Sequence, residues 1–262
     1  MEKGLQYADP GGTPLTLNAF LPPGQGPHPG VVLIHGGGWH AGSSRITDPV
    51  GMALARRGFA AFSINYRLAP KFPWPAAFDD AQSAVRWVRA NASKYDVNPD
   101  ELAAMGGSAG GNLALLLATS GEGTLDSGAR VRVAVSWSGA TNLTTLLAAN
   151  IPKATANING FVQCPGPSCQ ANLAAASPVT HVDSTDSTML IVNSSNEIIP
   201  FQQAQEMADA DKRAGVPYEL VQVPGDKHAQ AYLTSTVPTM SNETVAEISM
   251  SFLQKWIGNT RT

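Results

Sequence analysis

A serine inside a glycine-rich segment is the strongest chemical signal in this chain. Residues 106–110 read GGSAG, a G-x-S-x-G motif between a strand-like run at 101–105 and a helix-like run that starts at Gly110. In a nucleophile elbow, a sharp strand-to-helix turn leaves the serine hydroxyl exposed, and bulky side chains two positions before and after it would collide. The pattern therefore predicts Ser108 as a nucleophile, with Gly106 and Gly110 required on steric grounds.

A second glycine cluster lies upstream of this motif. Residues 35–39 read HGGGW and follow the apolar run 31–34. Backbone without side chains can approach a reacting carbonyl closely and point amide N–H groups at the oxyanion that develops there. The alternative is two glycine-rich turns with one incidental serine at position 108, but the two motifs together indicate acyl-transfer chemistry.

A serine nucleophile needs a base within hydrogen-bond reach, and the base needs a third group that fixes its tautomer. We predict His228 as the base, because it follows the last expected strand in a loop from which its side chain can return to the carboxyl edge of a sheet. The other histidines have structural interpretations: His28 in a Pro/Gly loop, His40 on a surface turn, His181 beside a strand start, and His35 as a hydrogen bonder that orients the glycine turn.

Six segments between residues 35 and 228 carry a family resemblance. They read HGGGW at 35–39, YRLAP at 66–70, FPWPA at 72–76, GSAGGN at 107–112, ASP at 176–178, and PG at 224–225 before His228. With these motifs the chain resembles the hormone-sensitive-lipase-like and feruloyl-esterase-like branch of the α/β-hydrolases.

The resemblance implies a carboxylic-ester hydrolase with Ser108 as nucleophile and His228 as base. It also implies an oxyanion hole formed by the backbone amides of Gly37, Gly38 and Ala109, and it places Trp39 at the substrate pocket. The segments 66–70 and 72–76 would be scaffold beside that pocket. Neither a metal ion nor an organic cofactor is implied.

The acid that should orient His228 is ambiguous. The loop after the expected strand at 189–193 reads SSNEIIP and contains no aspartate, and the position of the family's usual aspartate falls on Asn196. An asparagine can accept a hydrogen bond from imidazole but cannot neutralise an imidazolium, and in the serine-protease template the Asp-to-Asn change lowers turnover by about 10⁴. Either Glu197 rotates in as the acid or the enzyme is intrinsically slow. We favour Glu197, whose longer side chain could reach from one position further along; the alternative is a solvated loop charge.

The elements that must position these residues alternate along the chain. After a hairpin-like segment with glycines at 11–12, short β-branched runs alternate with helical ones, which is typical of a mostly parallel sheet with helices on both faces. We expect strands at 31–34, 60–66, 102–105, 131–136, 189–193 and 218–223. Apolar stripes at three- and four-residue spacing predict two helices facing the sheet: Phe78, Ala81, Val85 and Val88 in one, Val245, Ile248, Phe252 and Trp256 in the other.

One stretch interrupts the alternation. Residues 140–176 are rich in Asn, Ala and Leu, and an excursion of this length at strand ends is more often functional than a plain loop. We therefore expect a single α/β-hydrolase domain over 1–262, with 140–176 as a lid-like insertion. Because the chain starts at its first hairpin, without the helical cap of hormone-sensitive-lipase relatives, substrate selection should fall largely to this insertion.

Composition excludes several classes of partner. Charged residues make up 14% of the chain and the formal net charge is −3, so no basic face is available for nucleic acid or anionic lipid. No apolar run approaches the roughly twenty residues that span a bilayer, and no signal-peptide core follows the N-terminus. We expect a soluble protein. The sequence does not determine its cellular compartment or whether its N-terminus is native.

The two cysteines bear on that compartment. Cys164 and Cys169 flank a turn-forming PGP segment that can bring them together, so a small surface disulfide is the favoured interpretation. The alternatives are two free thiols or, less plausibly, a metal site, for which no other Cys or His lies nearby in sequence. A disulfide would favour a secreted protein.

These observations predict a serine ester hydrolase that works through an acyl-enzyme. A sparsely charged site suggests a neutral small-molecule ester with a short or aromatic acyl group, of acetyl or feruloyl type, by analogy with the family. The alternatives are an amidase on the same scaffold and a small-molecule binding protein that has lost catalysis, the latter motivated by Asn196. The oligomeric state is left open.

Overall fold

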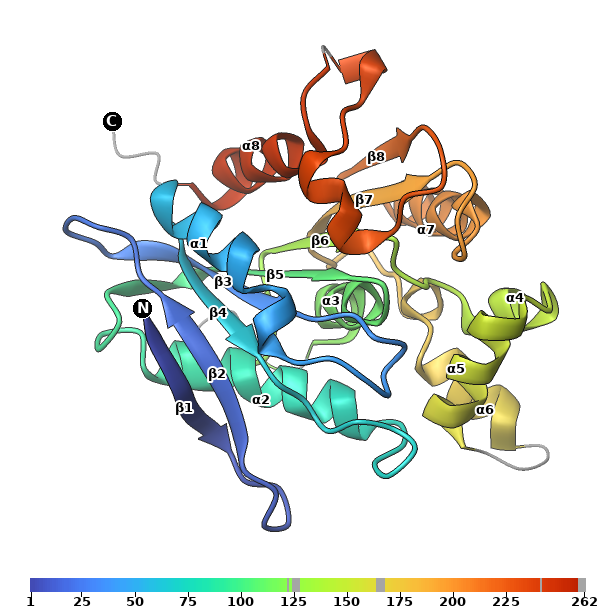
Figure 1. Cartoon of the computed structure of the whole chain (residues 1–262), viewed down its shortest axis with the longest axis horizontal. Coiled ribbons are helices and arrows are strands. Elements are labelled where there is room, and N and C mark those ends of the chain that lie inside the picture. Colours follow the sequence, from blue (N-terminus) through green and yellow to red (C-terminus); the bar gives the residue numbers. More distant parts are fainter. Residues whose placement is uncertain (122, 124–127, 164–167, 241, 259–262) are drawn as a thin grey trace.

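The computed structural model describes residues 1–258 except 122, 124–127, 164–167 and 241. Within these residues, eight strands form one sheet in the order β1-β2-β4-β3-β5-β6-β7-β8 (Figure 1). The strands are β1 (Glu2–Ala8), β2 (Leu15–Phe20), β3 (His28–Ile34), β4 (Ala60–Ile64), β5 (Val97–Gly107), β6 (Val133–Trp137), β7 (Thr188–Ser194) and β8 (Tyr218–Val223).

The sheet is mostly parallel, as the alternation of elements predicted. The pairs from β4 through β3, β5, β6 and β7 to β8 are all parallel, whereas β2 runs antiparallel to both β1 and β4. The predicted opening hairpin is therefore confirmed as β1 and β2. Strand bounds differ from expectation: β5 covers Val97–Gly107 rather than 102–105, and β3 begins at His28 rather than 31. Smaller differences are that β6 begins at Val133 rather than 131 and β4 ends at Ile64 rather than 66. Because the parallel strands share one direction, their carboxyl ends meet at one edge of the sheet.

Helices cover both faces of this sheet. On one face α1 (Asp48–Arg56) and α8 (Val245–Ile257) pack against a cluster that includes Leu33, Met105 and Val135. On the other face α2 (Ala76–Ala90), α3 (Ala109–Ser120) and α7 (Phe201–Ala214) pack against alternate residues such as Ile34 and Ile191. Successive strand residues thus point to opposite cores, as parallel strands buried on both faces require.

The two predicted amphipathic helices are confirmed as α2 and α8. Phe78, Ala81, Val85 and Val88 of α2 are all buried, and so are Val245, Ile248 and Phe252 of α8. The start of α8 is fixed by a capping box, in which the Thr244 hydroxyl accepts from the Glu247 amide and the Glu247 carboxylate accepts from the Thr244 amide. Local capping and the apolar stripe therefore specify the same helix.

The insertion between β6 and β7 folds as three helices beyond the carboxyl edge of the sheet (Figure 1): α4 (Leu143–Ala148), α5 (Pro152–Val162) and α6 (Ser168–Ala175). A single buried amide ties its two ends to α3. Asn112 Nδ2 donates to the carbonyl oxygens of Ala140, at 2.9 Å, and Ala176, at 3.0 Å. The elbow helix therefore anchors the insertion at both ends.

Short 3₁₀ turns complete the secondary structure, at Ser44–Ile46, Pro178–Thr180, Ala229–Thr234 and Pro238–Met240. Over the part of the chain that the structure describes, no helix combines the length and the apolarity that a bilayer crossing needs. The predicted disulfide between Cys164 and Cys169 involves Cys164, which lies outside the described residues.

Candidate active site

Ser108 lies at the carboxyl end of β5, in the middle of the sheet, where the chain turns sharply into α3. Its φ of +56° is in a region that residues with a side chain rarely adopt. Its amide donates to the Trp137 carbonyl at 2.8 Å, which fixes the turn against β6. A side chain at Gly106 would collide with the carbonyl of Gly110, and one at Gly110 with the carbonyl of Ile34. The steric requirement predicted for both glycines is confirmed.

The glycine cluster forms a tight turn directly after β3. Gly37 and Gly38 have φ values of +121° and +61°, and the Gly37 carbonyl accepts from the Ala41 amide at 3.0 Å. A side chain at Gly37 would collide with the Ala41 carbonyl, so only glycine fits there. No described residue accepts a hydrogen bond from the amides of Gly37, Gly38 or Ala109. These three N–H groups are free to bind a ligand oxygen.

The side chain of His35 packs under the glycine turn and is hydrogen-bonded to it. It is buried, its Nδ1 lies 2.7 Å from the Gly36 carbonyl, and its ring stacks on Tyr66 with centroids 4.2 Å apart. Burial lowers the pKa of His35 to about 4, so the ring is neutral at pH 7 and Nδ1 donates to the carbonyl. The Tyr66 hydroxyl in turn donates to the His35 carbonyl at 3.0 Å. His35 thus orients the glycine turn, as the sequence suggested.

The loops after β7 and β8 are joined by hydrogen bonds. The backbone N–H of Asn196 donates to the Gly225 carbonyl at 2.9 Å, and the Ser194 hydroxyl donates to the Lys227 carbonyl at 2.6 Å. This pairing brings Glu197 to His228, whose Nδ1 is hydrogen-bonded to Glu197 Oε2. Because an ionised carboxylate can only accept, Nδ1 carries the proton and Nε2 is left as the basic nitrogen.

The second oxygen of Glu197 is held by three donors. Oε1 accepts from the Ser138 hydroxyl at 2.8 Å, the Ser194 amide at 2.9 Å and the Tyr232 hydroxyl at 2.7 Å. The Glu197 side chain has 0% exposure. Burial, together with the charge of Glu197, raises the pKa of Tyr232, which keeps its hydroxyl protonated and able to donate. A buried carboxylate with this many donors is fixed in position.

Sequence reasoning missed these donors. Ser138 directly follows β6, so it lies at the same sheet edge as Ser108, and that placement was a usable signal. Tyr232 offered no comparable signal, because it lies in a 3₁₀ turn after His228. Asn196, the alternative acid, is exposed, and its side chain makes no hydrogen bond to any described residue. The structure brings Glu197, and not Asn196, to the imidazole.

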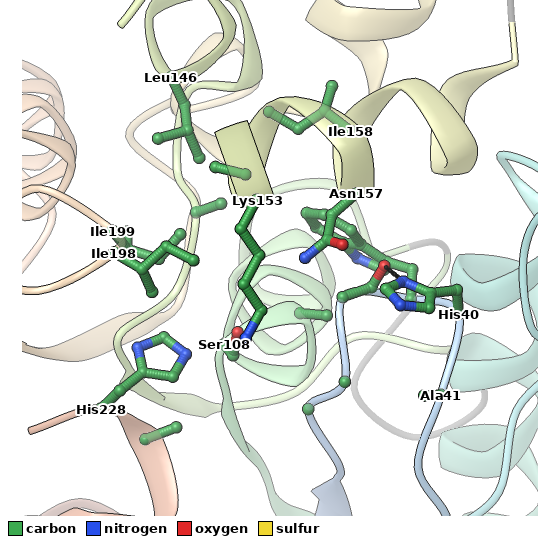
Figure 2. Close-up of a pocket in the computed structure, with 18 of the residues that line it drawn as sticks. His40, Ala41, Ser108, Leu146, Lys153, Asn157, Ile158, Ile198, Ile199 and His228 are labelled. Atoms are coloured by element: carbon green, nitrogen blue, oxygen red, sulfur yellow. Dashed lines mark hydrogen bonds between the residues drawn. The ribbon is translucent and has the colours of Figure 1, made fainter. Parts of the chain in front are cut away.

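Ser108 and His228 line one pocket of about 330 Å³, shown in Figure 2. The glycine turn contributes one wall, including the predicted pocket residue Trp39, which is 4% exposed and stacks on Phe161 of α5 with centroids 4.4 Å apart. The insertion and the loop after β7 supply apolar side chains: Leu146, Ala154, Ile158, Ile198 and Ile199. The insertion also contributes Lys153 and Asn157, which the sequence did not single out.

Residues 17–210 of this chain match the BD-FAE family. The match spans the glycine turn, the serine elbow and Glu197, and it ends before His228. The chain belongs to the BD-FAE family. The matched residues include part of β2 and all of β3 to β7, six of the eight strands described above, so the family match covers most of that sheet.

Individual relatives are esterases by name. The chain is 31% identical over 214 residues to the probable carboxylic ester hydrolase LipM of Mycobacterium tuberculosis, covering 78% of this chain and 50% of LipM. It is 27% identical over 263 residues to the esterase LipQ of the same organism, covering 93% of this chain and 60% of LipQ. The chain therefore spans less than two thirds of the length of these relatives.

Solved structures share the fold over nearly the whole chain. An acetyl ester-xyloside bifunctional hydrolase from Caldicellulosiruptor lactoaceticus superposes with a TM-score of 0.80 at 21% identity, covering 92% of this chain and 88% of that one. A thermophilic esterase from Thermogutta terrifontis, in its propionate-bound form, gives 0.78 at 23% identity, covering 98% and 95%. At such identities the similarity establishes the shared fold.

Proposed function

We propose that this chain is a serine carboxylic-ester hydrolase that works through an acyl-enzyme. The observation that carries the proposal is one pocket lined by both Ser108, on a strained elbow, and His228, whose other nitrogen is bound by the buried carboxylate of Glu197. Three amides without partners among the described residues lie at the same sheet edge. The names of the curated relatives and of the superposed structures support an esterase.

In the proposed reaction, Ser108 Oγ attacks the ester carbonyl carbon while His228 Nε2 takes the hydroxyl proton. The carbonyl oxygen becomes an oxyanion that accepts hydrogen bonds from the amides of Gly37, Gly38 and Ala109. His228 then protonates the leaving alcohol as the C–O bond breaks, which leaves the acyl group on Ser108. Water, deprotonated by the same imidazole, releases the acid and restores the serine. Glu197 fixes the tautomer and stabilises the imidazolium in both halves.

The pocket favours a small acyl group. Its volume of about 330 Å³ lies at the low end of the range typical of ligand sites, about 300–1,000 Å³. The Thermogutta terrifontis esterase has been solved with propionate and with butyrate, which are short acyl products of this kind. We therefore assign esters with short acyl groups, acetyl to butyryl, as the substrate class.

The test is hydrolysis of 4-nitrophenyl acetate and butyrate by the wild type, by Ser108→Ala and by Ser83→Ala. Ser83 lies on α2, away from the pocket, so it controls for loss of a serine hydroxyl. We expect Ser108→Ala to lower kcat by about 10⁴-fold or more, as removal of a serine nucleophile does elsewhere, and Ser83→Ala to keep wild-type turnover. Wild-type turnover no faster than that of Ser108→Ala would overturn the proposal.

The same variants, assayed also with 4-nitrobutyranilide and for ester binding, test the two rival functions. An amidase would hydrolyse 4-nitrobutyranilide at a rate comparable with the butyrate ester, whereas an esterase would favour the ester strongly. A binding protein that has lost catalysis would bind esters in the wild type and in Ser108→Ala alike, without turnover in either. The buried and fully hydrogen-bonded carboxylate behind His228 favours the enzyme, because a binding pocket does not require an oriented imidazole.

A further inference from the structure

One charged side chain in the pocket has no role in the proposed hydrolysis. Lys153 lines the cavity together with Ser108 and His228, and the residues that line it, all of them described, include no Asp, Glu or Arg. Lys153 is an exposed residue, so water also reaches its ammonium group, and the pocket lining offers it no carboxylate partner.

Local structure does not explain a lysine at this position. Lys153 is the second residue of α5, and the first turn of that helix contains no acidic residue. A cation near a helix N-terminus is unfavourable because it meets the positive end of the helix dipole. Lys153 also makes no ion pair or hydrogen bond with any described residue. Neither helix stability nor a structural ion pair requires this lysine.

The geometry aims the ammonium group at the reacting centre. The Lys153 side chain extends from α5 toward Ser108 (Figure 2). Asn157, one helical turn later, lines the same cavity, and its amide lies against Gly38 of the glycine turn. This face of α5 thus presents a cation and an amide to the space beside the nucleophile.

From this arrangement we infer that the pocket selects esters that carry a carboxylate, which Lys153 binds. The inference rests on the proposed ester hydrolysis and names its substrate class; the bonds made and broken at the ester are unchanged. A carboxylate on the substrate supplies the counter-charge that the pocket lacks, and a charge-assisted hydrogen bond to an ammonium is stronger than a neutral one. The carboxylate can belong to the acyl part or to the alcohol part of the ester.

Matched pairs of esters test both placements. For the acyl side, monomethyl succinate is compared with methyl 4-methylpentanoate, in which an isopropyl group replaces the carboxylate. For the alcohol side, 3-acetoxypropanoate is compared with 3-methylbutyl acetate. Acid release is followed by titration at constant pH for the wild type, Lys153→Met and Lys212→Met. Lys212 is an exposed lysine of α7 outside the pocket, so its variant controls for the loss of one positive charge.

We expect the wild type to prefer the anionic member of at least one pair in kcat/KM. Lys153→Met should raise KM for that ester by about threefold to tenfold, with less than a twofold effect on its neutral partner, as for loss of a partly exposed ion pair. Lys212→Met should keep the wild-type preference. Raising the ionic strength from about 0.01 to about 1 M shortens the screening length from about 30 to about 3 Å, so the preference should fall.

The outcomes separate this inference from the proposed function. If neutral esters are hydrolysed but neither anionic ester is preferred, or if Lys153→Met slows both members of a pair equally, the inference is wrong and the hydrolase proposal stands. Equal slowing would assign Lys153 to oxyanion stabilisation instead. If no ester is hydrolysed faster than by Ser108→Ala, the proposed function fails, and the inference fails with it.

Discussion

Among the described residues, Glu197 and Asp211 both have buried carboxylates, and the surroundings of these two groups are opposite. Glu197, at the carboxyl edge of the sheet, accepts hydrogen bonds from Ser138, Ser194, Tyr232 and His228. Asp211 of α7 has 0% exposure, and neither of its oxygens has a hydrogen-bond partner among the described residues. Burial, reinforced by the charge of Asp186, raises the pKa of Asp211 to about 7.

The fold stabilises the negative charge of Glu197 with hydrogen-bond donors, whereas none of the described residues provides a donor for the carboxylate of Asp211. Donors around Glu197 replace the water it loses, so its negative charge persists where an imidazolium would form. Asp211 loses its water without replacement, and its charged form costs stability. We therefore expect changes at Glu197 to appear mainly in turnover, and a change at Asp211 to appear in stability alone.

The largest effect should come from Glu197→Gln. A glutamine of the same size cannot neutralise an imidazolium and can hold the wrong imidazole tautomer, so we expect kcat for 4-nitrophenyl butyrate to fall by about 10⁴-fold. Steady-state kinetics at pH 7.5 measures this, with circular dichroism as the check on folding.

Asn196→Asp is the matched variant for that experiment. This variant places an aspartate at the position of the family's usual acid. Because residue 196 is exposed and its side chain makes no hydrogen bond to His228, we expect a change in kcat of less than about twofold. A silent Glu197→Gln combined with an accelerated Asn196→Asp would transfer the acid role to position 196 and contradict the comparison.

A smaller effect is expected from Tyr232→Phe. The variant removes one donor to Glu197 Oε1 but keeps the ring, which packs edge-on against Trp137 with centroids 6.2 Å apart. With one donor fewer, the carboxylate is positioned less firmly and orients the imidazole less well. We therefore expect kcat to fall by about tenfold, equivalent to about 1.4 kcal/mol, with KM unchanged. With fewer donors the carboxylate stabilises the imidazolium more, so the acid limb of the kcat/KM profile should move to higher pH. An unshifted profile with normal kcat would show that Tyr232 only fills space.

The smallest effect, confined to stability, is expected from Asp211→Asn. Because the pKa of Asp211 is raised to about 7 in the folded state, the folded protein binds more protons than the unfolded chain between about pH 4 and 7. Stability therefore falls as pH rises through this window, and the penalty is complete above pH 7. Removing the charge should stabilise the protein at pH 8 by roughly 1–2 kcal/mol, a few degrees in Tm, and much less at pH 4.5.

Asp209→Asn is the control for this measurement, since Asp209 is an exposed residue of the same helix. Thermal unfolding at both pH values should show no pH-dependent gain for it. Equal gains for the two variants, or no gain for Asp211→Asn at pH 8, would mean that Asp211 is not a buried charge of the kind described. Ester turnover should be unchanged in both variants.

Much of the fold could be read from the chain, because local and global signals agreed there. The period of three and four in α2 and α8, the β-branched runs of β3 and β7, and the two glycines flanking Ser108 each have one structural solution. Residues 140–176 were predicted as a lid-like insertion, but without their helices. The four- and three-residue spacing of Ala154, Ile158 and Phe161 was a usable signal for α5 that the sequence reasoning did not take up. The Ala-rich α6 has little contrast between apolar and polar faces, so it could not be predicted in this way.

The residues of the candidate site that follow directly from the order of strands and loops, Ser108 and His228, could be predicted from the sequence. The choice between Asn196 and Glu197 could not be predicted. Adjacent loop residues point in different directions, and only the pairing of the loops after β7 and β8 decides which side chain turns toward His228. Here the bond from the Asn196 amide to the Gly225 carbonyl fixes that loop, and Glu197 turns toward His228. Tyr232 and Ser138 come from different elements that meet only in the folded protein.

The most direct test of the account is covalent trapping of the nucleophile with diethyl 4-nitrophenyl phosphate, followed by peptide mass spectrometry. The account predicts one diethylphosphoryl group per chain, on Ser108, with loss of ester hydrolysis in proportion to labelling and much slower labelling in Glu197→Gln. Label on a different residue, or ester hydrolysis that persists when Ser108 is fully labelled, would contradict it.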